Sequence, residues 1–191
     1  MAEKVLVAYG SRYGATAEIA EKIGDTLKKE GIQADVLSAG KAGDVSKYNA
    51  FIIGSAAYIG QWRKDAVNLV VNNEKALAGK PVWIFSSGPT GEGDPVELVQ
   101  GWRYPKKLAP VIERIQPRDI AVFHGAAYAE KLNPLFKFML NMVKAPIGDF
   151  RDWNMIESWA KGIAGELKPE AEQKKPDTKP KKSQSKSKKK K

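Results

Sequence analysis

Two hydrophobic patterns alternate along the first 167 residues of the chain. Five short segments have the apolar runs or two-residue alternation of β-strands, and these are residues 5–8, 32–37, 50–54, 82–86 and 119–123. Five longer segments repeat apolar residues at helical spacing, and these are residues 16–30, 63–78, 104–116, 133–144 and 152–167. Strands that alternate with helices predict an α/β fold with a doubly wound, five-stranded parallel sheet, strand order 2-1-3-4-5, and helices on both faces.

Most of the predicted helices show one apolar stripe that should face the sheet. The stripe residues are Ile19, Ile23 and Leu27; Val67, Val70, Val71 and Leu77; Leu108, Val111, Ile112 and Ile115; and Trp153, Ile156, Trp159 and Ile163. Segment 133–144 is apolar on more than one side, with Phe136, Phe138 and Met142 among its residues. We expect it to pack into the core, and the alternative is a surface patch for a quinone, a membrane or a second subunit.

The turn after the first strand has the composition of a phosphate site. Residues 11–16 read SRYGAT and lead directly into the first helix. Backbone N–H groups, hydroxyls and the positive end of a helix dipole then converge on one place. The nucleoside triphosphate motif G-x-x-x-x-G-K-[ST] and the dinucleotide motif G-x-G-x-x-G are both absent. An ordinary strand-to-helix connection is the simpler alternative.

Two further loops should lie beside this turn. In the 2-1-3-4-5 order, the segments after strands one, three and four meet at one edge of the sheet. They are SAAYIGQW at residues 55–62 and SSGPTGEGD at residues 86–94. Tyr58 and Trp62 could offer ring faces to a flat ligand, and Gly60 and Gly88 could let the backbone approach it closely. An ordinary turn and a flexible surface loop are the alternatives.

The run SRYGAT resembles the [ST]-x-[TY]-G-x-T fingerprint of flavodoxins, and residues 4–167 are similar to the flavodoxin superfamily. The greatest similarity is to the branch that contains the bacterial menaquinone-dependent protoporphyrinogen oxidases. It rests on VLVAYGSRYGATAEIAEKIGDTL, AFIIGSAAYIGQWRKDAVNLV, AVFHGAAY, FKFMLNMV and DFRDWNMIESWA. The segment SGPTGEGDPVELVQGWRYP departs from that branch, which has a longer and more basic segment there. The resemblance therefore leaves a protoporphyrinogen oxidase-like dehydrogenase open without establishing porphyrinogen specificity.

The resemblance implies FMN as the cofactor. It assigns FMN binding to Ser11, Arg12, Tyr13, Gly14, Ala15 and Thr16; to Ser55, Ala56, Ala57, Tyr58, Ile59, Gly60 and Trp62; and to Ser86, Ser87, Gly88, Pro89, Thr90 and Gly91. Three functions stay open: an FMN oxidoreductase with a small-molecule substrate or quinone, an electron carrier between redox partner proteins, and a flavin-binding protein without turnover. A homo-oligomer is compatible with each.

The amino-acid composition excludes some kinds of chemistry and indicates where the protein is located. The chain has no cysteine and one histidine, which excludes disulfides and thiolate chemistry and makes a histidine metal site improbable. Residues 168–191 hold 11 lysines and three acidic residues, so they carry +8 of the formal net charge of +10. We expect them to form a disordered tail that contacts nucleic acid or an anionic membrane weakly. With no long apolar run and no secretory signal, the expected location is the cytoplasm, with peripheral membrane contact as an option.

A few other residues suggest chemistry by type alone. His124 ends the fifth predicted strand, where a structural hydrogen bond is a better expectation than catalysis. Asp149, Asp152 and Glu157 could hold a metal ion, but Asp152 more simply caps the last helix.

Overall fold

The computed structural model describes residues 4–142 and 144–168 of the chain. Five parallel strands form its central sheet in the order β2-β1-β3-β5-β6. Their bounds are β1 Lys4–Gly10, β2 Gln33–Ser38, β3 Ala50–Tyr58, β5 Val82–Ser87 and β6 Asp119–Phe123. Counted along these five strands, the order is the predicted 2-1-3-4-5, and the expected α/β class and sheet topology are confirmed. Apart from Lys168, the predicted lysine-rich tail lies outside the described residues.

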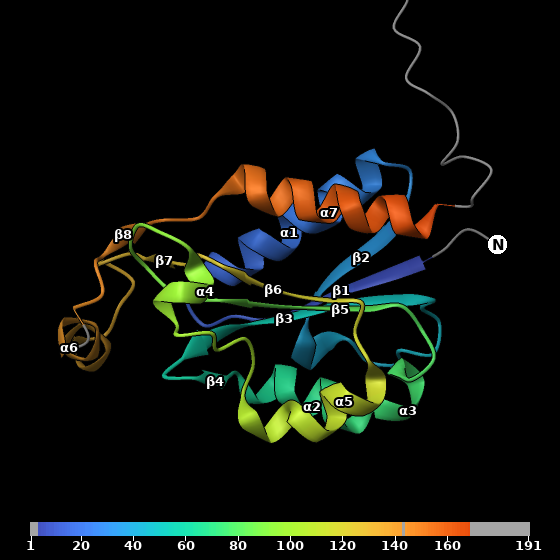
Figure 1. Ribbon diagram of the computed structural model, residues 1–191, viewed down its shortest axis with the longest axis horizontal. Helices are drawn as coiled ribbons and strands as arrows, with labels where there is room; N and C mark the ends of the chain where they lie inside the picture. Colours follow the sequence, from blue (N-terminus) through green and yellow to red (C-terminus); the bar gives the residue numbers. More distant parts are fainter. Residues whose placement is uncertain (1–3, 143, 169–191) are drawn as a thin grey trace, which may run out of the picture.

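Helices cover both faces of the sheet (Figure 1). On one face α1 packs against α7, and on the other lie α2, α3 and α5. The bounds are α1 Ala15–Lys29, α2 Lys64–Asn72, α3 Glu74–Leu77, α4 Pro95–Leu98, α5 Ala109–Ile115, α6 Pro134–Met142 and α7 Trp153–Leu167, with 3-10 turns at Ala39–Lys41 and Lys106–Leu108. The sheet therefore separates two apolar cores.

Most predicted stripes face these cores. Ile19, Ile23 and Leu27 are buried under α1, and the four stripe residues of α5 and its preceding turn are also buried. Val71 is an error of the prediction, because it is 45% exposed on the solvent side of α2. Trp153 is likewise partly exposed at the first turn of α7. The core positions of helices were thus more predictable than their ends.

Two predicted helices are shorter than expected. The segment 63–78 breaks at Asn73, whose side-chain amide donates to the Leu69 carbonyl while the backbone leaves the helical region. The segment 104–116 begins with a 3-10 turn, and its α-helix starts only at Ala109, with Pro110 in the first turn. Proline has no N–H to donate and is tolerated at that position, so Pro110 starts the helix rather than interrupting it.

The carboxyl ends of the parallel strands meet at one edge of the sheet, at the left of Figure 1. Several small elements that the sequence did not predict gather there. They are β4 (Gln61–Trp62), which pairs with the end of β3, and β7 (Ala126–Ala127), which pairs with β8 (Gly148–Asp149). Helix α6 lies beyond this edge, outside the two helical layers (Figure 1). The edge is the only part of the described structure where all three predicted loops meet.

Candidate functional site

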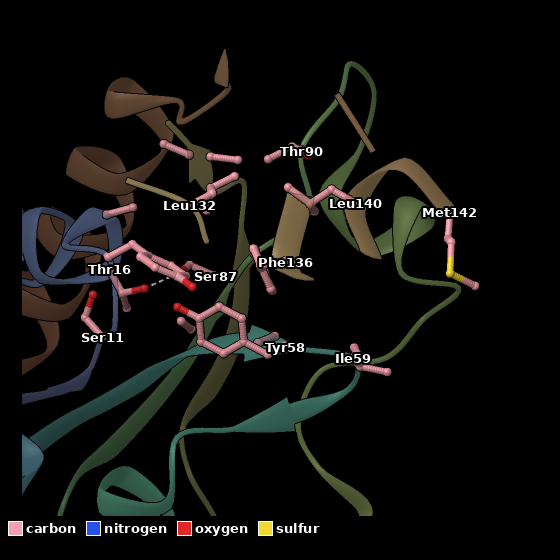
Figure 2. A pocket seen from close by; sticks show the side chains of 18 residues that line it. Ser11, Thr16, Tyr58, Ile59, Ser87, Thr90, Leu132, Phe136, Leu140 and Met142 are labelled. Atoms are coloured by element: carbon pink, nitrogen blue, oxygen red, sulfur yellow. Dashed lines mark hydrogen bonds between the residues drawn. The ribbon is translucent and has the colours of Figure 1, made fainter. Parts of the chain in front are cut away.

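A pocket of about 420 Å³ opens at this edge, between the ends of β1, β3 and β5 and helix α6 (Figure 2). Its walls come from the three loops predicted to bind the ligand, and also from residues after β6 and in α6 that were not predicted to do so. The lining residues are Ser11, Tyr13, Ala15, Thr16, Ala56, Ala57, Tyr58, Ile59, Ser87, Gly88, Thr90, Gly125, Ala126, Ala127, Leu132, Phe136, Leu140 and Met142. Eleven of the predicted site residues therefore share one cavity.

Hydroxyl groups gather at the α1 end of the pocket. The Thr16 and Ser87 hydroxyls are 2.8 Å apart, so they join the first turn to the end of β5. The Ser11 hydroxyl accepts a hydrogen bond from the Gly14 N–H at 3.1 Å. Gly14 precedes α1 with a φ of +97°, and no side chain caps this helix. The N–H groups of the first helical turn, which have no partners within a helix, are thus left for an anion beside these hydroxyls.

Three aromatic rings line the middle of the pocket. Phe136 of α6 packs against Tyr13 and Tyr58, with ring centroids 5.6 and 5.4 Å away, and the two tyrosine rings are 6.2 Å apart. Figure 2 shows Phe136 and Tyr58 beside each other in the middle of the pocket. Burial raises the pKa of Tyr58, and the neighbouring Tyr13 adds to this effect. The Tyr58 phenol is therefore neutral at physiological pH, and both tyrosines present an apolar ring face with a polar tip.

Two buried hydroxyls have no hydrogen-bond partner among the described residues. They are those of Tyr13 and Thr90, and both side chains line this pocket. A buried hydroxyl without a partner is costly, so each is a ready contact for a polar group of a ligand. Together with the hydroxyl-rich helix end and the aromatic wall, they fit a flat molecule with a phosphate and several polar ring atoms. FMN has these features.

Close backbone packing fixes the loop that follows β5. A Cβ atom on Gly88 would lie 3.0 Å from the Ala57 carbonyl oxygen, and one on Gly125 would lie 3.0 Å from the Gly88 Cα. The absence of a side chain at Gly88 therefore allows close packing against the protein's own backbone, and the expected approach to a ligand stays a prediction. The His124 side chain contacts the same loop, since its Nδ1 and Nε2 lie 3.3 and 2.9 Å from the carbonyl oxygens of Pro89 and Gly93. This is the structural role expected for His124.

A second, more open cavity of about 650 Å³ adjoins the first. The two share Ala57, Ile59, Gly88, Thr90 and Leu140 as walls. Its other lining residues are Gly60, Pro89, Gly91, Glu92, Leu98, Val99, Trp102, Lys144, Ala145 and Pro146. Three more of the predicted site residues, at positions 60, 89 and 91, thus face this cavity rather than the aromatic pocket.

Five predicted residues line neither cavity. Trp62 is 4% exposed in the core under α2, and its indole N–H donates to the Ser86 hydroxyl at 2.8 Å. The Ser55 hydroxyl accepts from the Arg63 N–H at 3.0 Å. Trp62, Ser55 and Ser86 therefore support the loops from behind, and the expectation that the Trp62 ring faces a ligand is corrected. In the first turn, Arg12 is exposed and Gly14 is half-buried.

An ion network under the first turn was missed by the sequence analysis. The Arg151 side chain is 2% exposed and donates to Glu18 at 2.7 Å, to Asp149 at 2.6 Å and to the Ala15 carbonyl at 3.1 Å. Burial disfavours the charge on Arg151, but the hydrogen bonds to Asp149 and Glu18 outweigh it and raise the pKa of the guanidinium. In return, Arg151 lowers the pKa of Asp149 to about 2. The network anchors the start of α1 to the segment before α7.

The possible metal cluster is taken up by other contacts. Asp149 binds Arg151, Asp152 caps α7 by accepting from the N–H groups of Asn154 and Met155, and Glu157 pairs with Lys22 and Lys161. Within residues 4–142 and 144–168, no group of three acidic or histidine side chains is placed to hold a metal ion.

The site residues that were missed come from the last third of the chain. Gly125, Ala126 and Ala127 follow β6, and Leu132, Phe136, Leu140 and Met142 come from α6 and the segment before it. The apolar character of segment 133–144 was the available signal, but it did not show which side would face the pocket. The expectation that this segment packs into the core is wrong for Leu135 and Phe138, which are 69% and 62% exposed.

Comparison with known proteins agrees with this geometry. Residues 6–153 match the family model of the flavodoxin domain. The protoporphyrinogen IX dehydrogenase [quinone] of Escherichia coli (strain K12) is 23% identical over 172 residues, which cover 84% of this chain and 94% of that protein.

Solved structures with the same fold include a flavodoxin from the domain Archaea, with 16% identity and a TM-score of 0.55 over 86% of this chain and 98% of the other. A Fusobacterium nucleatum flavodoxin bound to flavin mononucleotide has 14% identity and a TM-score of 0.55 over 88% and 99%.

Proposed function

The chain belongs to the flavodoxin domain family, and from this premise we propose that it is an FMN-dependent oxidoreductase. The observation that carries the proposal is that the two ends of the 420 Å³ pocket differ in chemical character. Hydroxyls and an uncapped helix start lie at one end, and aromatic and aliphatic side chains lie at the other. FMN is a molecule with a charged phosphate at one end and a flat ring system at the other.

The proposal assigns a role to each wall of the pocket. Ser11, Thr16 and the first N–H groups of α1 would bind the phosphate through charge-assisted hydrogen bonds. Tyr13, Tyr58 and Phe136 would enclose the ring, and the free hydroxyls of Tyr13 and Thr90 would contact its polar substituents. FMN itself supplies the redox chemistry when bound, and the protein binds it, orients it and excludes water.

The adjoining 650 Å³ cavity favours an enzyme over a pure electron carrier. It shares five wall residues with the first pocket, so a second reactant placed there would lie next to the flavin. The similarity to a quinone-dependent dehydrogenase supports the same reading. We keep electron transfer between redox partner proteins as the second candidate, because the solved relatives include flavodoxins. A cytoplasmic location and a homo-oligomer stay predictions.

The cofactor and the class of reaction can be tested one after the other. Mass spectrometry of the ligand released from the purified protein should identify FMN rather than FAD, because the described residues form one phosphate site, at the start of α1. A screen of reduced nicotinamides and quinones on the loaded protein should then give multiple turnovers with a small molecule. A protein that takes up no flavin contradicts the cofactor assignment. A protein that exchanges electrons only with other proteins contradicts the enzyme assignment.

A further inference from the structure

Helix α6 presents an apolar stripe to solvent, and of its three residues only Met142 also lines the pocket. Leu135 and Met142 are each 69% exposed, and Phe138 is 62% exposed. Their spacing of three and four residues places them on one side of the helix. Phe136 and Leu140 lie on the adjoining side and line the pocket. One part of the apolar surface of α6 therefore faces the pocket while the other is open.

The stripe continues onto neighbouring segments. Ile59, at the turn between β3 and β4, is 78% exposed and lines the same pocket as Met142. Figure 2 shows both side chains at the end of the cavity that is farther from Ser11 and Thr16. Leu98 is also exposed, and it lines the second cavity together with Ile59. A group of exposed apolar side chains of this kind marks an interaction site.

The charge near this surface favours one kind of binding partner over another. Between residues 131 and 147 the chain contains Lys131, Lys137 and Lys144 and no acidic residue. On a helical projection of about 100° per residue, Lys137 and Asn141 form the polar side of α6, next to the exposed stripe. In a two-fold dimer through α6, the lysines of one copy would lie near those of the other, and their like charges would repel. An anionic lipid surface would instead attract the lysines while it accepts the stripe.

We propose that α6 is an interfacial helix that docks the protein on an anionic lipid membrane, with Leu135 and Phe138 in the acyl boundary and Lys137 at the headgroups. Within residues 4–142 and 144–168, no helix has the length and apolar character that a membrane crossing requires. Stable attachment through one short helix needs a second signal. The segment from residue 169 to 191 adds ten lysines, and 23 residues can span up to about 80 Å. Its lysines can therefore reach the same surface.

Vesicle flotation with the full-length protein tests the proposal. The protein should bind vesicles of phosphatidylcholine and phosphatidylglycerol, and only weakly those of phosphatidylcholine alone. Phe138→Asp and Leu135→Asp should each lower the partition coefficient by about tenfold or more, since each side chain leaves apolar surroundings. Val71→Asp is the matched control, because Val71 is exposed on α2, far from α6, and should bind as the unmodified protein does. Neither Leu135 nor Phe138 lines a cavity, so flavin uptake checks that the variants fold.

A depth measurement separates insertion from attraction by the lysines alone. On vesicles that contain phosphatidylglycerol, tryptophan placed at the stripe by Phe138→Trp should be quenched by lipids brominated on the acyl chain. The same residue introduced by Val71→Trp should not be quenched. The proposal is overturned if the aspartate variants partition like Val71→Asp, or if Phe138→Trp stays unquenched. It is also overturned if ultracentrifugation shows a dimer that Phe138→Asp dissociates while vesicles bind neither protein.

Discussion

At the residue scale, the phosphate end of the pocket depends on a few hydroxyls whose partners lie on different loops. Thr16 and Ser87 share a hydrogen bond of 2.8 Å between the first turn and the end of β5. A hydroxyl has one donor and two acceptor positions, so Thr16 can keep Ser87 and still contact a phosphate oxygen. The pair therefore links the geometry of the loops to the position of the ligand.

Thr16→Val should weaken FMN binding more than it weakens the fold. Losing a hydrogen bond to a charged group costs about 1.5–3 kcal/mol, or roughly tenfold to hundredfold in Kd. Riboflavin, which has no phosphate, should lose much less affinity. Thr26→Val is the matched control, because Thr26 is buried in the same helix and donates to the Lys22 carbonyl, away from the pocket. Equal losses for FMN and riboflavin, measured by fluorescence titration, would show that Thr16 supports the loops only.

Tyr58 and Trp62 should behave in opposite ways. Tyr58→Leu removes a ring from the pocket wall, so bound flavin should be less quenched and its reduction potential should change, with stability little affected. Trp62→Phe removes a core hydrogen bond to Ser86, so it should lower the free energy of unfolding by about 1–3 kcal/mol and leave the flavin spectrum as it was. Unfolding curves and flavin spectra of both variants test this. If the flavin spectrum changes in Trp62→Phe and not in Tyr58→Leu, the Trp62 indole contacts the flavin after all.

At the element scale, the parallel sheet and the helices of its two layers could be predicted because their residues follow one period and bury one face. Ile19, Ile23 and Leu27 are such a case. The Trp62 error arose because sequence places a residue in a loop but does not say which way the ring points. The loop at 55–62 is in fact the end of β3 and a tight hairpin, which buries the indole. Arg151 was missed because its partner Glu18, 133 residues away in the sequence, meets it only in the folded chain.

Gly88→Ala should show how tightly the strand ends are packed. The added methyl would meet the Ala57 carbonyl oxygen at 3.0 Å and the Ala57 Cβ at 3.3 Å, so backbone must move. Overpacking of this kind costs about 1–3 kcal/mol, and it should also reduce FMN affinity because both loops line the pocket. Gly162→Ala is the control, since a Cβ there meets nothing within 4 Å in the middle of α7. It should stabilise the protein by about 0.5–1 kcal/mol. Thermal unfolding that ranks the two variants the other way contradicts this packing.

At the scale of the whole molecule, Arg151 joins segments that lie far apart in the described chain. It ties the start of α1 to β8 and, through its position 4.5 Å above the Trp153 ring, to the start of α7. Removing one partner of a buried ion pair leaves an uncompensated charge, which is why such networks are sensitive to substitution and to pH.

The stability of the protein should fall in acid partly through Asp149. Arg151 lowers the pKa of Asp149 from its ordinary 3.8 to about 2. The contribution is therefore complete above about pH 4 and is lost as the pH falls through 2. Urea unfolding at a series of pH values should show Asp149→Asn less stable at neutral pH, with a difference that shrinks toward pH 2. A difference that is independent of pH would mean that the carboxylate charge does not matter.

We expect one pocket to bind FMN with its phosphate at the start of α1. Titration of the flavin-free protein with FMN and with riboflavin, followed by flavin fluorescence, measures this binding. Binding should saturate at one FMN per chain with strong quenching, and FMN should bind at least about tenfold tighter than riboflavin, because the phosphate adds charged hydrogen bonds. Absence of saturable binding, or equal affinity for the two flavins, would contradict it.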